Sequence, residues 1–168
     1  MMKEISRIGV IGSGQMGAGI AQVSAMSGYE TLIWDVSKDN LTENVKGIFS
    51  QLNKMVEKGK LTAIQSEAAK ALLFAGNTMQ DFASCDLVVE AATENFQVKA
   101  EIFKNLDETL KPEGILASNT SSISITKIAA TTKRPSQVIG MHFMNPVPLM
   151  KLVELIRGIQ TNDETYNA

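Results

Sequence analysis

Near its amino terminus the chain reads IGVIGSGQMG from Ile8 to Gly17, and this stretch decides the fold. A short apolar run leads into three glycines spaced G-x-G-x-x-G, and a helical pattern then continues from Gln15 to Ser27. A glycine turn between a buried strand and a helix leaves backbone N–H groups free at the positive end of the helix dipole. The combination is typical of the phosphate-binding turn of a dinucleotide-binding fold.

Each part of the turn has a physical role in such a site. Gly12 permits the tight turn, Gly14 lets a pyrophosphate approach the backbone, and Gly17 lets the helix sit close to the strand. Gln15 and Met16 stand in the first turn of the helix, whose N–H groups would face the phosphates. We therefore expect these five residues to contact a dinucleotide.

Asp35 completes the fingerprint, because it ends the next predicted strand. A carboxylate there accepts hydrogen bonds from the adenosine ribose and repels a 2′-phosphate, so the sequence favours NAD over NADP. Enzymes that bind FAD or S-adenosylmethionine use related turns and remain alternatives at this point.

Short apolar runs alternate with helical patterns along the rest of the chain. Their residues are continuously apolar, as in strands that are covered on both faces of a parallel sheet. We predict an α/β, Rossmann-like, doubly wound fold with a mostly parallel sheet and right-handed crossovers. The predicted strands are Ile8–Ile11, Thr31–Trp34, Leu72–Ala75, Leu87–Val89, Gly114–Ala117 and Val138–Met141, with a further helix over Val98–Leu110.

Residues 38–70 depart from this alternation, because they show helical but almost no strand character. Apolar residues from Leu41 to Met55 recur every three or four positions and form one stripe. Gly59 is expected to separate this helix from a second one that begins near Thr62. The pair is predicted to be a helical arm inserted into the sheet, either as a lid or substrate arm or as structural decoration.

Composition limits the remaining classes of function. The chain has 168 residues, 44% of them hydrophobic and 20% charged, which suits one globular domain over residues 1–168. Its net charge of −2 gives no basic excess for nucleic acid or membrane surfaces. The single cysteine, Cys85, rules out an internal disulfide and a multi-cysteine metal site. We expect a cytoplasmic protein without a metal, a nucleic-acid partner or a membrane partner.

The only histidine, His142, follows a predicted strand, at the sheet edge where ligands bind in doubly wound folds. The loop HFMNPVP over residues 142–148 would hold its ring in a partly apolar setting. Glu154 lies in the largely apolar segment 151–155, which a carboxylate enters with a partner. A His142–Glu154 pair is the economical interpretation, and a surface glutamate on an edge strand is the alternative.

A cluster of hydroxyl and amide side chains, Ser118 to Ser122, follows another predicted strand. Such a cluster most often caps a helix. At the carboxyl edge of the sheet it would also offer contacts to a substrate.

Taken together, these motifs resemble the amino-terminal domain of the 3-hydroxyacyl-CoA dehydrogenase family, from Arg7 to the end of the chain. The resemblance rests on the glycine turn, on LVVEAATEN over residues 87–95, on SNTSS over residues 118–122, and on HFMNPVPLMKLVE over residues 142–154. It implies transfer of hydride between NAD and the third carbon of 3-hydroxyacyl-CoA or 3-oxoacyl-CoA. The expected substrate pair is 3-hydroxybutyryl-CoA and acetoacetyl-CoA.

The resemblance also implies roles for particular residues. His142 would be the catalytic base, Glu154 its partner and Ser121 a contact to the substrate oxygen. The helical arm would bind the acyl-CoA. The remaining implied contacts are Glu94, Lys99, Asn119 and Asn145 for the cofactor, and Ser50, Lys54 and Lys58 for CoA.

Members of this family are longer and carry a helical carboxyl-terminal domain that completes the cleft and forms most of the dimer interface. The sequence is therefore expected to be a catalytic half that binds NAD with little turnover. Two alternatives remain open. One is an NAD-binding module without activity, and the other is a different Rossmann-fold hydroxyacid dehydrogenase with a lysine base.

Overall fold

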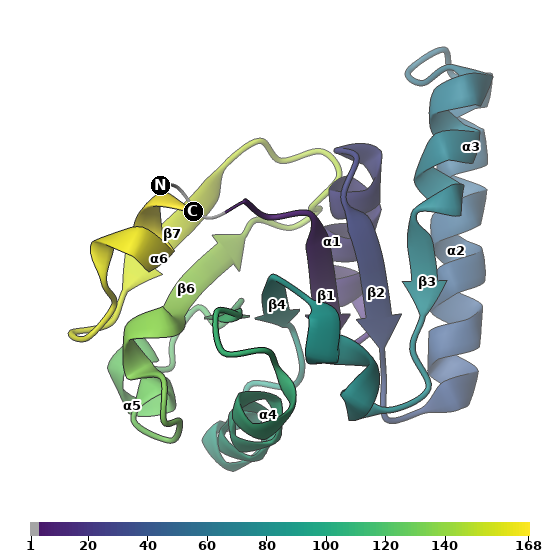
Figure 1. The fold of residues 1–168 in the computed structure, drawn as a ribbon. Coiled ribbons are helices and arrows are strands. Elements are labelled where there is room, and N and C mark those ends of the chain that lie inside the picture. The colour runs from purple at the N-terminus through teal and green to yellow at the C-terminus, as the bar shows by residue number, and fades with distance from the viewer. Residues whose placement is uncertain (1–3) are drawn as a thin grey trace.

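The computed structural model describes residues 4–168. Within these residues the chain forms a seven-stranded sheet in the order β3-β2-β1-β4-β5-β6-β7 (Figure 1). Every pairing is parallel except that of β6 with β7. The strands are β1 (Arg7–Ile11), β2 (Glu30–Trp34), β3 (Leu73–Ala75), β4 (Leu87–Glu90), β5 (Ile115–Ser118), β6 (Val138–Phe143) and β7 (Val153–Arg157).

Helices cover both faces of the sheet. The helices are α1 (Gln15–Met26), α2 (Lys38–Glu57), α3 (Ala63–Ala71), α4 (Phe96–Thr109), α5 (Ile125–Ala129) and α6 (Asp163–Asn167), with 3-10 turns at Met79–Ser84 and Pro135–Gln137. The predicted doubly wound α/β fold is confirmed, and the antiparallel strand β7 is an addition to the predicted strands.

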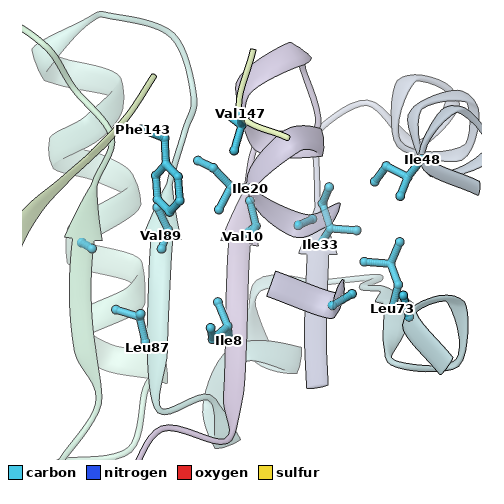
Figure 2. Packing of buried hydrophobic residues seen from close by; sticks show 14 of the residues in the cluster. Ile8, Val10, Ile20, Ile33, Ile48, Leu73, Leu87, Val89, Phe143 and Val147 are labelled. Carbon is cyan, nitrogen blue, oxygen red and sulfur yellow. The ribbon is translucent and has the colours of Figure 1, made fainter. Parts of the chain in front are cut away.

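The strands alternate their side chains between two cores, as the pleat of a strand requires. Ile8 and Val10 of β1 pack with α1 and the helical arm, in the core drawn in Figure 2. Ile11 packs on the opposite face, with side chains of α4 and α5. Burial on both faces explains why these strands read as continuous apolar runs.

The helical arm forms as predicted, from α2 and α3, which lie side by side beyond the β3 edge of the sheet (Figure 1). Leu41, Ile48 and Leu52 are the buried residues of α2. The break falls at Gly59, whose φ of +66° favours glycine. Thr62 begins α3 in a capping box with Gln65, so both predicted boundaries are confirmed.

Candidate active site

The glycine turn lies where the strand order of the sheet reverses. Chain connections run from β1 to β2 and β3 on one side, and then return to β4 on the other side of β1. In doubly wound sheets the crevice at the carboxyl ends of such strands is the usual ligand site. Gly12 has a φ of +92°, and a Cβ there would lie 2.7 Å from the Ala91 carbonyl oxygen. A Cβ on Gly17 would lie 1.8 Å from the Gly12 oxygen, so the turn excludes side chains at both positions.

The backbone at this turn fits the pyrophosphate of a dinucleotide. Gly14 is the N-cap of α1, and within residues 4–168 no side chain caps that helix. A Cβ built on Gly14 would meet no described atom within 4 Å beyond its own chain neighbours, so the space beside the start of α1 is open. Gly12, Gly14 and Asp35 line a pocket of about 610 Å³ beside the turn. This is the geometry that an anionic ligand at a helix N-terminus requires.

Asp35 follows the end of β2 and is held by the turn itself. Its Oδ2 accepts hydrogen bonds from the Ser13 N–H at 2.7 Å and the Ser13 hydroxyl at 2.9 Å. Its Oδ1 accepts from the Ser37 N–H at 2.9 Å. Burial alone would raise the pKa of Asp35, but these hydrogen bonds outweigh it and lower the pKa below its ordinary value. Asp35 is therefore a fixed carboxylate at neutral pH.

His142 and Glu154 form a pair across the β6–β7 hairpin. They stand directly opposite each other in the antiparallel register, and the distance from His142 Nδ1 to Glu154 Oε2 is 2.9 Å. The side chain of Glu154 is 49% exposed. The two interpretations of Glu154 therefore combine, because it is an edge-strand glutamate and also the partner of His142.

A second pocket, of about 320 Å³, gathers most of the predicted catalytic and cofactor residues. Ala91 and Ala92 line both this pocket and the one beside the glycine turn, so the two pockets adjoin there. Asn119, which follows β5, also contacts the end of β6, since its Oδ1 accepts a hydrogen bond from the Phe143 N–H at 2.9 Å. The predicted residues that line this second pocket are Met16, Glu94, Lys99, Asn119, Ser121, His142 and Asn145.

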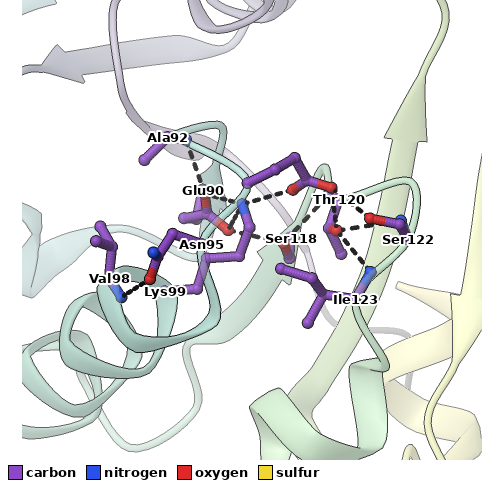
Figure 3. A network of polar contacts seen from close by, with 10 residues as sticks. Glu90, Ala92, Asn95, Val98, Lys99, Ser118, Thr120, Ser122 and Ile123 are labelled. Carbon is purple, nitrogen blue, oxygen red and sulfur yellow. Dashed lines mark hydrogen bonds and ion pairs between the residues drawn. The ribbon is translucent and has the colours of Figure 1, made fainter.

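Beneath this pocket lies a buried polar network that sequence reasoning missed (Figure 3). Glu90, which ends β4, is fully buried, and its oxygens lie 2.7 and 3.0 Å from the ammonium nitrogen of Lys99. Glu90 also accepts from the Ala92 N–H and the Ser118 hydroxyl, each at 2.7 Å. A charged residue at the end of an apolar strand was the available signal, because buried charges require partners.

The hydroxyl cluster joins the same network instead of capping a helix. Thr120 and Ser122 donate to Glu94 Oε2 at 2.8 and 2.9 Å. The N-cap of α5 is Ser124, which accepts from the Lys127 N–H. The expectation that Ser118–Ser122 cap a helix is thus wrong; Thr120 and Ser122 instead donate hydrogen bonds to Glu94 at the edge of the pocket.

A third pocket, of about 500 Å³, separates the helical arm from α1 and the loop after β6. Lys54 and Lys58 line it, and so does Gln15, which therefore borders this groove as well as beginning α1. Ser50 is exposed on α2, outside the residues that line the groove. The structure thus brings together two of the three predicted CoA contacts.

Two features are absent from residues 4–168. In this part of the chain, none of the helices is long and apolar enough to cross a membrane. In the same residues, no group of three or more His, Cys, Asp or Glu side chains is arranged to hold a metal ion.

Comparison with known proteins identifies relatives over nearly the whole chain. Residues 7–168 match the family described as "3-hydroxyacyl-CoA dehydrogenase, NAD binding domain". A probable 3-hydroxybutyryl-CoA dehydrogenase of Deinococcus radiodurans is 55% identical over 95% of this chain and 57% of its own length. The 3-hydroxybutyryl-CoA dehydrogenase of Bradyrhizobium diazoefficiens is 50% identical over 100% of this chain and 57% of its own.

The solved structures agree with the sequence relatives. A 3-hydroxybutyryl-CoA dehydrogenase of Escherichia coli superposes with a TM-score of 0.96 at 45% identity, over 98% of this chain and 35% of that one. The chain spans little more than half the length of the curated relatives it matches. The glycine turn, the sheet topology and the family match agree: the chain belongs to the 3-hydroxyacyl-CoA dehydrogenase family and matches its NAD-binding domain.

Proposed function

We propose that this chain is the catalytic half of an NAD-dependent 3-hydroxyacyl-CoA dehydrogenase, with 3-hydroxybutyryl-CoA and acetoacetyl-CoA as its substrate pair. The observation that carries the proposal is the His142–Glu154 contact of 2.9 Å, at a pocket that adjoins the glycine turn. An acid–base pair beside a dinucleotide site is what oxidation of a secondary alcohol requires.

The chain's own residues would move the proton and hold the oxygen. If Nδ1 of a neutral His142 donates to Glu154, Nε2 carries the lone pair that accepts the substrate hydroxyl proton. Glu154 then stabilises the imidazolium that forms, and Ser121, which lines the same pocket, hydrogen-bonds the reacting oxygen. In the reverse direction His142 returns the proton to that oxygen. NAD, when bound, supplies the hydride acceptor.

The cofactor in this proposal spans the two adjoining pockets. Asp35 would hold the adenosine ribose, the N-terminus of α1 the pyrophosphate, and the pocket lined by His142 the nicotinamide. Glu94, Lys99, Asn119 and Asn145 would surround the nicotinamide end. The fixed charge of Asp35 favours NAD over NADP, because it would repel a 2′-phosphate.

The groove between α1 and the arm is the proposed acyl-CoA site. Lys54, Lys58 and Lys60 line it, and three cations suit the phosphates of CoA. Ser50, one helical turn before Lys54, is a secondary contact in this proposal.

The proposal includes a further domain that completes the cleft and carries most of a dimer interface. Its support is that the relatives are longer and that Leu149, Leu152 and Leu155 are 68%, 57% and 45% exposed around β7. A cytoplasmic location also belongs to the proposal, since the single thiol, Cys85, is buried and unpaired among the described residues.

Cofactor binding is tested by thermal unfolding of the chain with NAD and with NADP. We expect NAD to raise the unfolding temperature and NADP to raise it much less. A folded protein that does not respond to NAD would refute the cofactor assignment.

Turnover is tested by NADH oxidation with acetoacetyl-CoA, using the chain alone and with a carboxyl-terminal domain of a relative added in trans. Activity only in the second assay supports the catalytic-half proposal, whereas inactivity in both favours a binding module. Full activity of His142→Ala would favour a lysine base instead.

A further inference from the structure

The pocket that holds His142 carries an unbalanced negative charge. Lys99 lies between two carboxylates, 2.7 and 3.0 Å from the oxygens of Glu90 and 3.2 Å from Glu94 Oε1. The side chains of Glu90 and Lys99 are 0% and 1% exposed, so the two form a buried, mutually neutralising pair. The charge of Glu94 is therefore the surplus charge of the network.

Glu94 holds that charge at a fixed place on the pocket wall. Its side chain is 45% exposed and lines the pocket. Thr120 and Ser122 donate hydrogen bonds to its Oε2, while Lys99 contacts its Oε1. Burial alone would raise the pKa of Glu94, but these hydrogen bonds and the Lys99 charge outweigh it and lower the pKa. The carboxylate is therefore ionised at neutral pH.

Charge near the nicotinamide ring acts differently on the two redox forms of the cofactor. The ring of NAD is cationic and that of NADH is neutral, whereas the adenosine, riboses and pyrophosphate are the same in both. Contacts at the glycine turn and at Asp35 therefore act equally on the two forms. A fixed anion beside the ring acts mainly on the oxidised form.

We infer that Glu94 makes this pocket discriminate between the redox forms, favouring NAD over NADH relative to a pocket without that charge. The inference rests on the proposed function, which places the nicotinamide in this pocket. It also has a consequence for direction. Because binding free energies are linked, weaker relative binding of NADH makes the bound cofactor a stronger hydride donor. The reduction of 3-oxoacyl-CoA is then favoured on the protein, while the equilibrium in solution is unchanged.

The test is the ratio of the dissociation constants of NAD and NADH, measured with wild type and Glu94→Gln. NADH binding is followed by its fluorescence, and NAD binding by displacement of NADH. Glutamine keeps an oxygen for Thr120 and Ser122 and removes the charge. We expect the ratio of the NAD constant to the NADH constant to rise by about three- to tenfold, as for one unit charge near a solvated pocket. The rise should shrink at about 1 M salt, where the Debye length is near 3 Å.

Two further variants separate charge from shape. Glu94→Asp keeps the charge, so its ratio should stay close to wild type. Glu101→Gln makes the same chemical change in the pocket beside Asp35, away from the ring, and should also leave the ratio unchanged. If Glu94→Gln weakens both forms alike, Glu94 is only structural and the inference is overturned. If wild type binds neither form, the proposed function itself fails, and the inference with it.

Discussion

Replacing Asp35 with asparagine tests the cofactor preference and the construction of the glycine turn in one experiment. The carboxylate accepts three hydrogen bonds, two from Ser13 on Oδ2 and one from Ser37 on Oδ1. An asparagine has a single acceptor oxygen, so one backbone N–H would face an amide NH₂ group. We expect a loss of about 1–2 kcal/mol in the free energy of unfolding, as for an unsatisfied, part-buried donor.

The same change should reduce the preference for NAD over NADP, because it raises the affinity for NADP and lowers the affinity for NAD. A carboxylate about 4 Å from a doubly charged phosphate in water costs about 2 kcal/mol, so NADP affinity should rise by about thirtyfold. Losing a charged acceptor for the ribose hydroxyls costs about 1.5 kcal/mol, so NAD affinity should fall by about tenfold.

The assay is isothermal titration calorimetry with each cofactor, supported by thermal unfolding without ligand. Asp39→Asn is the matched control, because Asp39 is an exposed carboxylate in the first turn of α2 that lies outside the residues lining the Asp35 pocket. It should change neither affinity by more than about twofold, as expected for a screened charge. An Asp35→Asn protein that keeps the wild-type ratio of NAD to NADP affinity would refute the assignment of Asp35 to the ribose.

Three further outcomes are expected. Asp86 is buried and accepts hydrogen bonds from Lys111 and from backbone N–H groups. These bonds outweigh the effect of burial and hold the pKa of Asp86 well below its ordinary value of 3.8. The ionised Asp86 therefore stabilises the folded protein fully above pH 3.8, and this stabilisation is lost as the pH falls toward the folded-state pKa. Chemical denaturation of Asp86→Asn between pH 7 and pH 3 should show a stability at pH 7 lower by about 2 kcal/mol and a smaller loss on acidification; an unchanged acid slope would contradict this. Gly17→Ala places a Cβ 1.8 Å from the Gly12 oxygen, so thermal unfolding should show a destabilised protein, and titration should show loss of NAD binding. In the assay with the added domain, His142→Ala should lower kcat by about 10²–10⁴-fold with little change in NAD affinity, and an equal loss of NAD affinity would argue for a structural role.

The sequence predicted the architecture because its signals were local. The turn from Gly12 to Gly17 fixes a strand before it and a helix after it, and the structure places both there. Gly59 and Thr62 likewise mark the boundary between the two helices of the arm, because Gly59 adopts a positive φ and Thr62 caps α3. Strand β7 was harder to predict, because its residues from Val153 to Arg157 are mostly exposed on an edge.

The site was predictable only in part, because some of its contacts join residues that are distant in sequence. The pairing of His142 with Glu154 followed from the cost of placing a carboxylate in an apolar segment. Glu90 was missed because its ties to Lys99 and Ser118 exist only once β4, α4 and β5 are assembled. The local signal, a charged residue that ends an apolar strand, does not by itself separate such a glutamate from one that ends a strand in solvent.

The His142–Glu154 pair depends on the register of a hairpin, and this has a consequence for tolerance to change. Side chains alternate between the two faces of a strand, so moving β7 by one residue would turn Glu154 away from the imidazole. The exposed residues from Leu149 to Leu152 are free of that constraint, whereas Asn145 lines the His142 pocket and Val147 is buried in the core. Insertions there should keep the His142–Glu154 contact while they reshape the wall of the proposed acyl-CoA groove next to Leu149, which makes these residues a place to test changes in acyl-CoA selectivity.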